Sequence, residues 1–223
     1  MLSPDIINHA IPDWITIIVI CILIWLTWIR NLYDYKWNDF IRSIFSDRYI
    51  GKLMKEEVHV LQKLFYALFL VFIVAAGLYI YRTIQLKQDA SLLGYQGVKL
   101  FIWICLGILS LYILKLFILK IIGLVFNAPK EFDEYINVVL LYNNVAGILL
   151  LPVVVMLLWS PYANAMLYFG GAIIILTYLY RIVRGIGIGL SNRKLSKIYL
   201  FYYLCALEIC PMLIGIKLIS NIF

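Results

Sequence analysis

The chain has 223 residues, of which 65% are apolar and 14% are charged, and its formal net charge is +7. A soluble domain is only about 45–50% apolar, so this composition excludes a water-soluble fold and points to the lipid bilayer as the solvent. The sequence predicts one all-α transmembrane domain over residues 1–223, a polytopic membrane protein with six transmembrane helices plus an interfacial amphipathic helix.

The first apolar run predicts a transmembrane helix at Trp14–Ile29. The preceding segment Met1–Asp13 contains no Lys or Arg. A secretory signal carries positive charge before its apolar stretch. We therefore expect the first run to be a retained span and not a cleaved signal.

The connection that follows, residues 30–63, is basic and carries apolar side chains at helical spacing: Trp37, Phe40, Ile41, Ile44 and Phe45. This pattern predicts a helix over Trp37–Phe45 that lies in the cytoplasmic membrane interface, with its aromatic face in lipid. Two roles remain open for the connection. It is either a membrane-surface connector or a docking surface for a cytoplasmic partner.

Four further apolar runs predict helices at Leu64–Tyr81, Val98–Ile122, Ile136–Trp159 and Ala165–Val183. Ahead of the third of these, Pro129 and three acidic residues are typical of a solvated helix start, because proline fits the first turn and acidic side chains favour the positive end of the helix dipole. Gly77 and the pair Gly170-Gly171 are predicted to be close-packing positions.

The last run predicts a sixth helix at Ile198–Ile219 and places Glu208 near its middle. A charge at that depth costs several kcal/mol unless it is paired, protonated or hydrated. Pro211 lacks an amide proton and leaves the Leu207 carbonyl without its helical donor. Glu208 is therefore a structural carboxyl, a transport or proton-relay group, or a contact for a ligand or partner.

Four other polar residues of the spans complete a candidate intramembrane polar site with Glu208 and Pro211: Lys115, Asn137, Asn144 and Arg181. With a rise of about 1.5 Å per residue, Glu208 lies about 15 Å into its span from the cytoplasmic side. Lys115 enters its own span from the same side and has a long side chain, so it is the first candidate partner of Glu208, ahead of Arg181. Asn137 and Asn144 are seven residues apart and share a helix face. The same span also carries Asn143, and the amides of these asparagines either join helices or line a polar cavity with Glu208.

The basic residues predict the orientation. Of the 19 Lys and Arg residues, 15 fall on the side of the connections after the first, third and fifth spans. Because cytoplasmic loops are enriched in Lys and Arg, the sequence predicts a multi-pass protein of the bacterial cytoplasmic (inner) membrane with both termini in the periplasm.

The distribution of reactive side chains argues against an enzyme. The two histidines, His9 and His59, fall outside the predicted spans, and the four cysteines lie in apolar runs without metal-ligand spacing. We expect no catalytic residue, no metal and no cofactor. The expected partners are the lipid bilayer and other membrane proteins, with no nucleic acid.

The last predicted span contains Tyr-Tyr-Leu-Cys-Ala-Leu-Glu-Ile-Cys-Pro at residues 202–211. This segment, with the order of elements before it, resembles a family of small integral membrane proteins from Bacteroidota that is known as a domain of unknown function. The resemblance implies a bacterial inner-membrane location and implies no activity.

Two functions of different classes follow from the sequence. The first is a non-enzymatic accessory or assembly component of an envelope complex, in keeping with short outer loops and the absence of catalytic motifs. The alternative is a small proton- or ion-coupled transporter or channel that uses Glu208. A continuous polar path from Glu208 to one membrane surface would favour the second.

Overall fold

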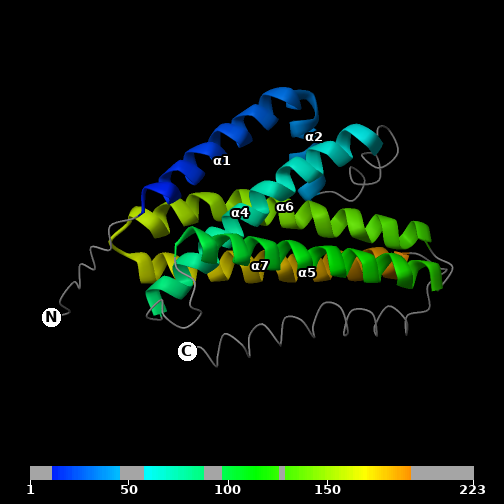
Figure 1. Ribbon diagram of the computed structural model, residues 1–223. Helices are drawn as coiled ribbons and strands as arrows, with labels where there is room; N and C mark the ends of the chain where they lie inside the picture. The colour runs from blue at the N-terminus through cyan, green and yellow to red at the C-terminus, as the bar shows by residue number, and fades with distance from the viewer. Residues whose placement is uncertain (1–11, 46–57, 88–96, 126–128, 192–223) are drawn as a thin grey trace.

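The computed structural model describes residues 12–45, 58–87, 97–125 and 129–191 (Figure 1). These residues are almost entirely helical, with no strand in the described ranges. The helices are α1 (Asp13–Leu32), α2 (Asp34–Phe45), α4 (Val58–Lys87), α5 (Val98–Val125), α6 (Pro129–Trp159) and α7 (Ala163–Ser191). The all-helical class predicted from the sequence is therefore confirmed for this part of the chain.

Five of the described helices are long and apolar enough to cross a membrane, namely α1, α4, α5, α6 and α7. They correspond to the first five predicted spans. The predicted sixth span, Ile198–Ile219, lies outside the described residues. Pro129 begins α6 as predicted. Gly97, with φ of 67°, precedes α5 and takes a backbone conformation that other residues rarely adopt.

Helix α6 is the centre of the bundle. It is the most buried of the five candidate spans and packs against α4, α5 and α7. Helix α1 packs mainly against α4, and Figure 1 shows α5, α6 and α7 running alongside one another while α1 and α4 cross them obliquely. The three peripheral helices α1, α5 and α7 leave most of their surface open.

The buried apolar side chains form three clusters, and these fix the relative directions of the helices. One cluster joins the start of α1 to the end of α4, the start of α5 and the end of α6, through members such as Ile15, Tyr81, Phe101 and Leu157. The other two join the opposite ends of these helices. Consecutive spans therefore run in opposite directions.

Glycines allow the helices to approach closely at three places. A Cβ atom at Gly147 of α6 would lie 2.6 Å from the Cα of Phe72 in α4, and one at Gly77 would lie 2.7 Å from Cys105 Sγ in α5. A Cβ atom at Gly170 would meet the ring of Tyr79, whose hydroxyl donates a 2.6 Å hydrogen bond to the Leu167 carbonyl. The predictions for Gly77 and Gly170 are confirmed, and Gly147 is an addition.

Helix α2 is present where the sequence predicted it, but its aromatic face does not point into lipid. Phe40 is only 2% exposed and belongs to the same buried cluster as Leu64 and Phe65 of α4. Its ring centroid lies 5.8 Å from that of Trp37 and 6.3 Å from that of Phe65. The prediction that the aromatic side chains of this helix face lipid is thus wrong for Phe40, because α4 offers it an aromatic partner.

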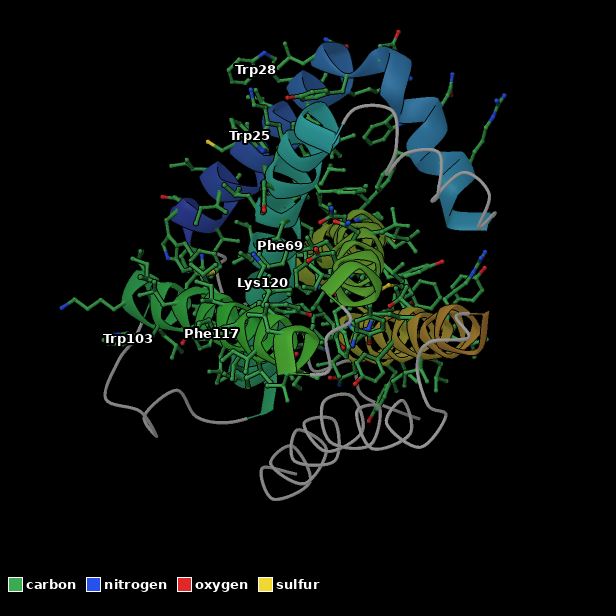
Figure 2. The ribbon with its side chains drawn as sticks, turned by 90° about the vertical axis from the view of Figure 1, so that its right-hand side faces the viewer. Trp25, Trp28, Phe69, Trp103, Phe117 and Lys120 are labelled. Carbon is green, nitrogen blue, oxygen red and sulfur yellow. The ribbon has the colours of Figure 1, made fainter. Side chains whose placement is uncertain are left out.

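A broad apolar surface remains on the outside of the bundle. Exposed large side chains include Trp28 on α1, Trp103 and Phe117 on α5, and Phe169 on α7. The labelled side chains Trp28, Trp103 and Phe117 can be followed in Figure 2. Soluble monomers rarely expose apolar patches of more than a few hundred Å², so a surface of this kind requires lipid or protein around it.

Candidate functional site

Two consecutive asparagines of the central helix form the core of a buried polar cluster. Asn143 is 5% exposed and Asn144 is 0% exposed. Because neighbouring residues of an α-helix differ by about 100° around its axis, the two amides point toward different helices. Together they connect α6 to the three helices around it.

Asn143 joins α6 to α5 and α7. Its Oδ1 atom accepts a hydrogen bond from the Tyr112 hydroxyl of α5 at 3.2 Å and another from the Nη1 group of Arg181 in α7 at 3.2 Å. Asn144 joins α6 to α4, because its Nδ2 atom donates to the Phe65 carbonyl at 3.1 Å. Hydrogen bonds between helices are a recurrent source of association where lipid surrounds the protein.

Arg181 is a cation held inside the helix bundle, with 3% of its surface exposed. Its guanidinium carbon lies 4.4 Å from the centroid of the Tyr178 ring, one turn earlier on α7. A planar, delocalised guanidinium stacks well on an aromatic face and is more weakly hydrated than an ammonium group. The neighbouring rings of Tyr142 and Tyr180 pack edge to face at 5.3 Å, so this part of the α6–α7 interface is rich in tyrosine.

Some of the polar atoms of this cluster keep hydrogen-bonding capacity. Among the described residues, the Asn143 Nδ2 and the Asn144 Oδ1 atoms are buried without a hydrogen-bond partner. Buried polar groups in proteins are normally hydrogen-bonded to protein or water. The two asparagine side chains therefore keep one donor and one acceptor for a water molecule or another polar group.

The structure places the predicted site residues unequally. Asn144 and Arg181 are buried, as a site inside the bundle requires, whereas Lys115 and Asn137 are half-buried. Arg181 contacts Asn143, and Asn144 faces α4 instead. Glu208 and Pro211 lie outside the described residues.

Sequence reasoning named Asn143 but left it out of the candidate site, and it missed Tyr112 and Tyr178 as members of the cluster. Signals for them were present, since Asn143 adjoins Asn144 and Tyr112 lies one helical turn before Lys115. Both tyrosines fall in apolar runs, where the sequence indicates only that the ring faces lipid or the protein core. A polar role for the hydroxyl or the ring face becomes visible only once the contacting residue is known. That partner comes from another helix and not from the local sequence.

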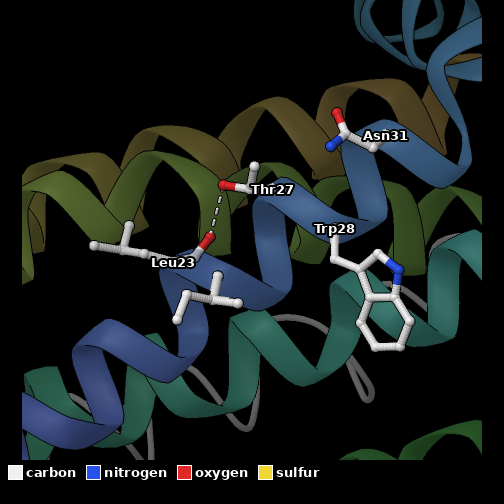
Figure 3. A pocket seen from close by; sticks show the side chains of 5 residues that line it. Leu23, Thr27, Trp28 and Asn31 are labelled. Atoms are coloured by element: carbon white, nitrogen blue, oxygen red, sulfur yellow. Dashed lines mark hydrogen bonds between the residues drawn. The ribbon is translucent and has the colours of Figure 1, made fainter.

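A second feature is a shallow groove on the outer side of α1, lined by Leu23, Ile24, Thr27, Trp28 and Asn31 (Figure 3). The Thr27 hydroxyl donates to the Leu23 carbonyl of its own helix at 2.9 Å, and the Trp28 ring is 56% exposed. The groove thus offers mainly apolar atoms. It does not gather the chemistry that the cluster around Asn143 gathers.

These observations indicate the general class of the protein. Five long apolar helices, an open apolar exterior and polar side chains turned inward are compatible with a multi-pass membrane protein. The chain belongs to the family described as a domain of unknown function, DUF4271, whose model matches residues 15–219. No curated protein and no solved structure matches the chain.

Proposed function

We propose that this protein is a non-enzymatic accessory or assembly component of an envelope complex in the cytoplasmic (inner) membrane of a bacterium of the Bacteroidota. The observation that carries the proposal is that the buried polar groups join helices to one another. Hydrogen bonds of Asn143, Asn144 and Tyr79 connect each of these residues to a neighbouring helix. A bundle fastened in this way is suited to act as a fixed body that presents its outer surfaces to other membrane proteins.

In this proposal the chain crosses the membrane six times, with both termini in the periplasm. The described helix ends that carry Arg30, Lys63, Lys120 and Arg184 lie together at one end of the alternating bundle. That end is then the cytoplasmic one. The sixth span is Ile198–Ile219, which supplies the even number of crossings.

Helix α2 serves as the interfacial element of the proposed topology. Phe40 attaches it to α4, while Ile41 and Arg42 on its other side are exposed. An exposed apolar residue beside an exposed cation suits the boundary between acyl chains and anionic headgroups. The helix is then a membrane-surface connector, and its exposed polar side is the place where a cytoplasmic partner would dock.

Photo-crosslinking in living cells tests the proposed role. Three variants each carry a crosslinking amino acid at one outward-facing position: Trp103, Phe117 or Phe169. Each variant should form a crosslink to a partner of the same complex. The same amino acid at Leu150, which is buried, is the control and should give no such product. Deleting the gene should shift the partner complex to a smaller size on native gels. An unchanged complex in the deletion strain would contradict the assembly role.

One observation favours the alternative, a small proton- or ion-coupled transporter or channel that uses Glu208. The Asn143 amide, which bonds to the buried Arg181 cation, keeps a free donor, as in a site that binds a polar guest, and the adjacent Asn144 keeps a free acceptor. Cysteines at positions 143 and 144 would then react with a water-soluble thiol reagent. Reactivity above that of a cysteine at buried Leu150 would favour transport, and equal low reactivity would favour the assembly role.

A further inference from the structure

A second buried cation lies at the opposite end of the bundle from the basic connections. Arg82, in the last turns of α4, has only 8% of its surface exposed. Its Nη1 group donates to the Oε1 atom of Gln85 at 3.1 Å, and the Nε–H group is buried without a hydrogen-bond partner in the described part of the chain. A buried donor without a partner is destabilising, so an additional acceptor at this site would stabilise the protein.

Gln85 does not supply that acceptor, because its Oε1 atom bonds to a different nitrogen of the Arg82 guanidinium and the Nε–H group has no partner among the described residues. Its Oε1 atom accepts from Arg82, and its Nε2 atom donates to the Tyr81 hydroxyl at 2.7 Å. The two bonds fix the orientation of the amide and hold the guanidinium in one place. They leave the Nε–H group without an acceptor in the described part of the chain, and this group lies on the edge of the guanidinium that forms paired hydrogen bonds with a carboxylate or phosphate.

The position of Arg82 along α4 selects the ligand. Its neighbour Tyr81 packs edge to face against Trp14 at 5.3 Å, and Trp14 also packs against Phe101 at 5.6 Å. Clustered tryptophan and tyrosine rings are typical of the headgroup layer of a membrane. The acidic side chain Asp13, at the same end of the bundle, is exposed on α1. In the proposed topology, on which this inference rests, Arg82 lies at the depth of the headgroup layer, where the abundant anion is the phosphate group of the lipids themselves.

We propose that Arg82 binds a phosphate group at the periplasmic end of α4, held through its Nε edge while Gln85 and Tyr81 keep the guanidinium in position. The source is the phosphodiester of a phospholipid in the outer leaflet. Free phosphate has the same chemistry, and the experiment below separates the two sources. The lipid would then hold α4 at a defined depth, close to the contact of Tyr79 with α7.

The test measures thermal unfolding of the purified full chain in a neutral detergent. Phosphatidylethanolamine, monogalactosyldiacylglycerol with the same acyl chains, and inorganic phosphate are added separately. The first two lipids have no net charge, and only the first contains phosphate. We expect phosphatidylethanolamine to raise the melting temperature more than the galactolipid does. Equal shifts from the two lipids, without a shift from inorganic phosphate, would overturn the proposal.

Variants locate the effect. In Arg82→Gln the apparent affinity for phosphatidylethanolamine should fall about tenfold, which corresponds to about 1.4 kcal/mol. Arg82→Lys should keep part of it, because an ammonium group is a point charge without the paired donors of arginine. Lys99→Gln removes an exposed cation from the start of α5 and should change nothing.

Two further results would test the site and its ligand, and a fallback measurement covers a variant that does not fold. A full phospholipid response in Arg82→Gln would place the binding elsewhere and overturn the proposal. A shift produced by millimolar inorganic phosphate alone, and lost in Arg82→Gln, would keep the phosphate site and make free phosphate its ligand. If Arg82→Gln does not yield folded protein, the comparison of the two lipids on the wild-type chain and on Arg82→Lys decides the matter.

Discussion

The Asn143 side chain shows how much of the bundle depends on one amide. Its oxygen accepts from Tyr112 of α5 and from Arg181 of α7, so its loss would leave a hydroxyl and a guanidinium without this acceptor inside the protein. Removing one partner of a buried hydrogen bond costs more than the bond itself, because the other partner stays desolvated.

We therefore expect Asn143→Leu to lower the free energy of unfolding by about 1–3 kcal/mol. Tyr112→Phe removes one of the two donors and should cost about 0.5–1.5 kcal/mol. Equilibrium unfolding in mixed micelles of dodecyl maltoside and SDS measures both. Asn164→Leu, at an exposed position near the start of α7, is the matched control. A cost for Asn143→Leu no larger than for Asn164→Leu would show that the amide does not join the helices.

The polar cluster was predictable in part. Hydropathy alone singles out Asn144 and Arg181, because a polar side chain in an apolar run must turn inward. It cannot assign Asn143 to Arg181, since that pairing depends on which side of α6 is covered by α7. Glu208, the residue that the sequence marks most clearly, lies outside the described residues, and its role stays a prediction.

At the scale of the helices, close approach is governed by glycine. Gly147 lies where α6 meets α4, and an added methyl group would meet the backbone of Phe72, which cannot move aside as a flexible side chain can. Gly107 of α5 offers a matched contrast, because a Cβ atom there would meet nothing within 4 Å.

Gly147→Ala should therefore destabilise the protein by about 1–3 kcal/mol, as overpacking does. Gly107→Ala should change stability by less than about 1 kcal/mol, in the stabilising direction, because alanine favours the helix. The same unfolding assay compares the two variants. A Gly147→Ala variant as stable as the wild-type chain would mean that α4 and α6 do not pack as closely as described.

Helix α2 provides a second pair of contrasting positions. Phe40→Ser should detach α2 from α4, because Phe40 packs on Phe65, while Ile41→Ser changes a neighbour that is 43% exposed. Limited proteolysis of inverted membrane vesicles should cleave the Phe40→Ser variant faster near residues 34–45 than the Ile41→Ser variant. Faster cleavage of Ile41→Ser would mean that lipid contacts of the outer side, and not α4, hold the helix.

The sequence predicts the elements better than their surroundings. Five long apolar runs identify α1, α4, α5, α6 and α7, because the bilayer requires a satisfied backbone over the whole crossing. The same periodicity identifies α2 but cannot tell whether Phe40 meets lipid or protein, since both are apolar. Nothing in the hydropathy of α6 marks it as the central helix either. Its buried position follows from packing against three neighbours.

At the scale of the whole molecule, the proposed orientation makes a direct prediction. In a chain whose native cysteines are replaced, a cysteine at Tyr162 should react with a membrane-impermeant maleimide added to intact spheroplasts, because the turn between α6 and α7 is then periplasmic. A cysteine at Asp133, near the start of α6, should react only after the membrane is opened. Both positions are exposed. The reverse pattern would invert the topology.

The central place of α6 also bears on the order in which the chain enters the membrane. During synthesis α1, α4 and α5 emerge before α6, so the face of α4 that later receives Gly147 and the carbonyl that later receives Asn144 first meet lipid. Only residues 160–162 separate α6 from α7. This short turn favours the insertion of both helices as one hairpin, which brings Asn143 and Arg181 into the bilayer already facing each other. Biogenesis of the bundle would then be completed by its second half, and a ribosome paused before residue 163 would leave α6 without α7, one of its three neighbours.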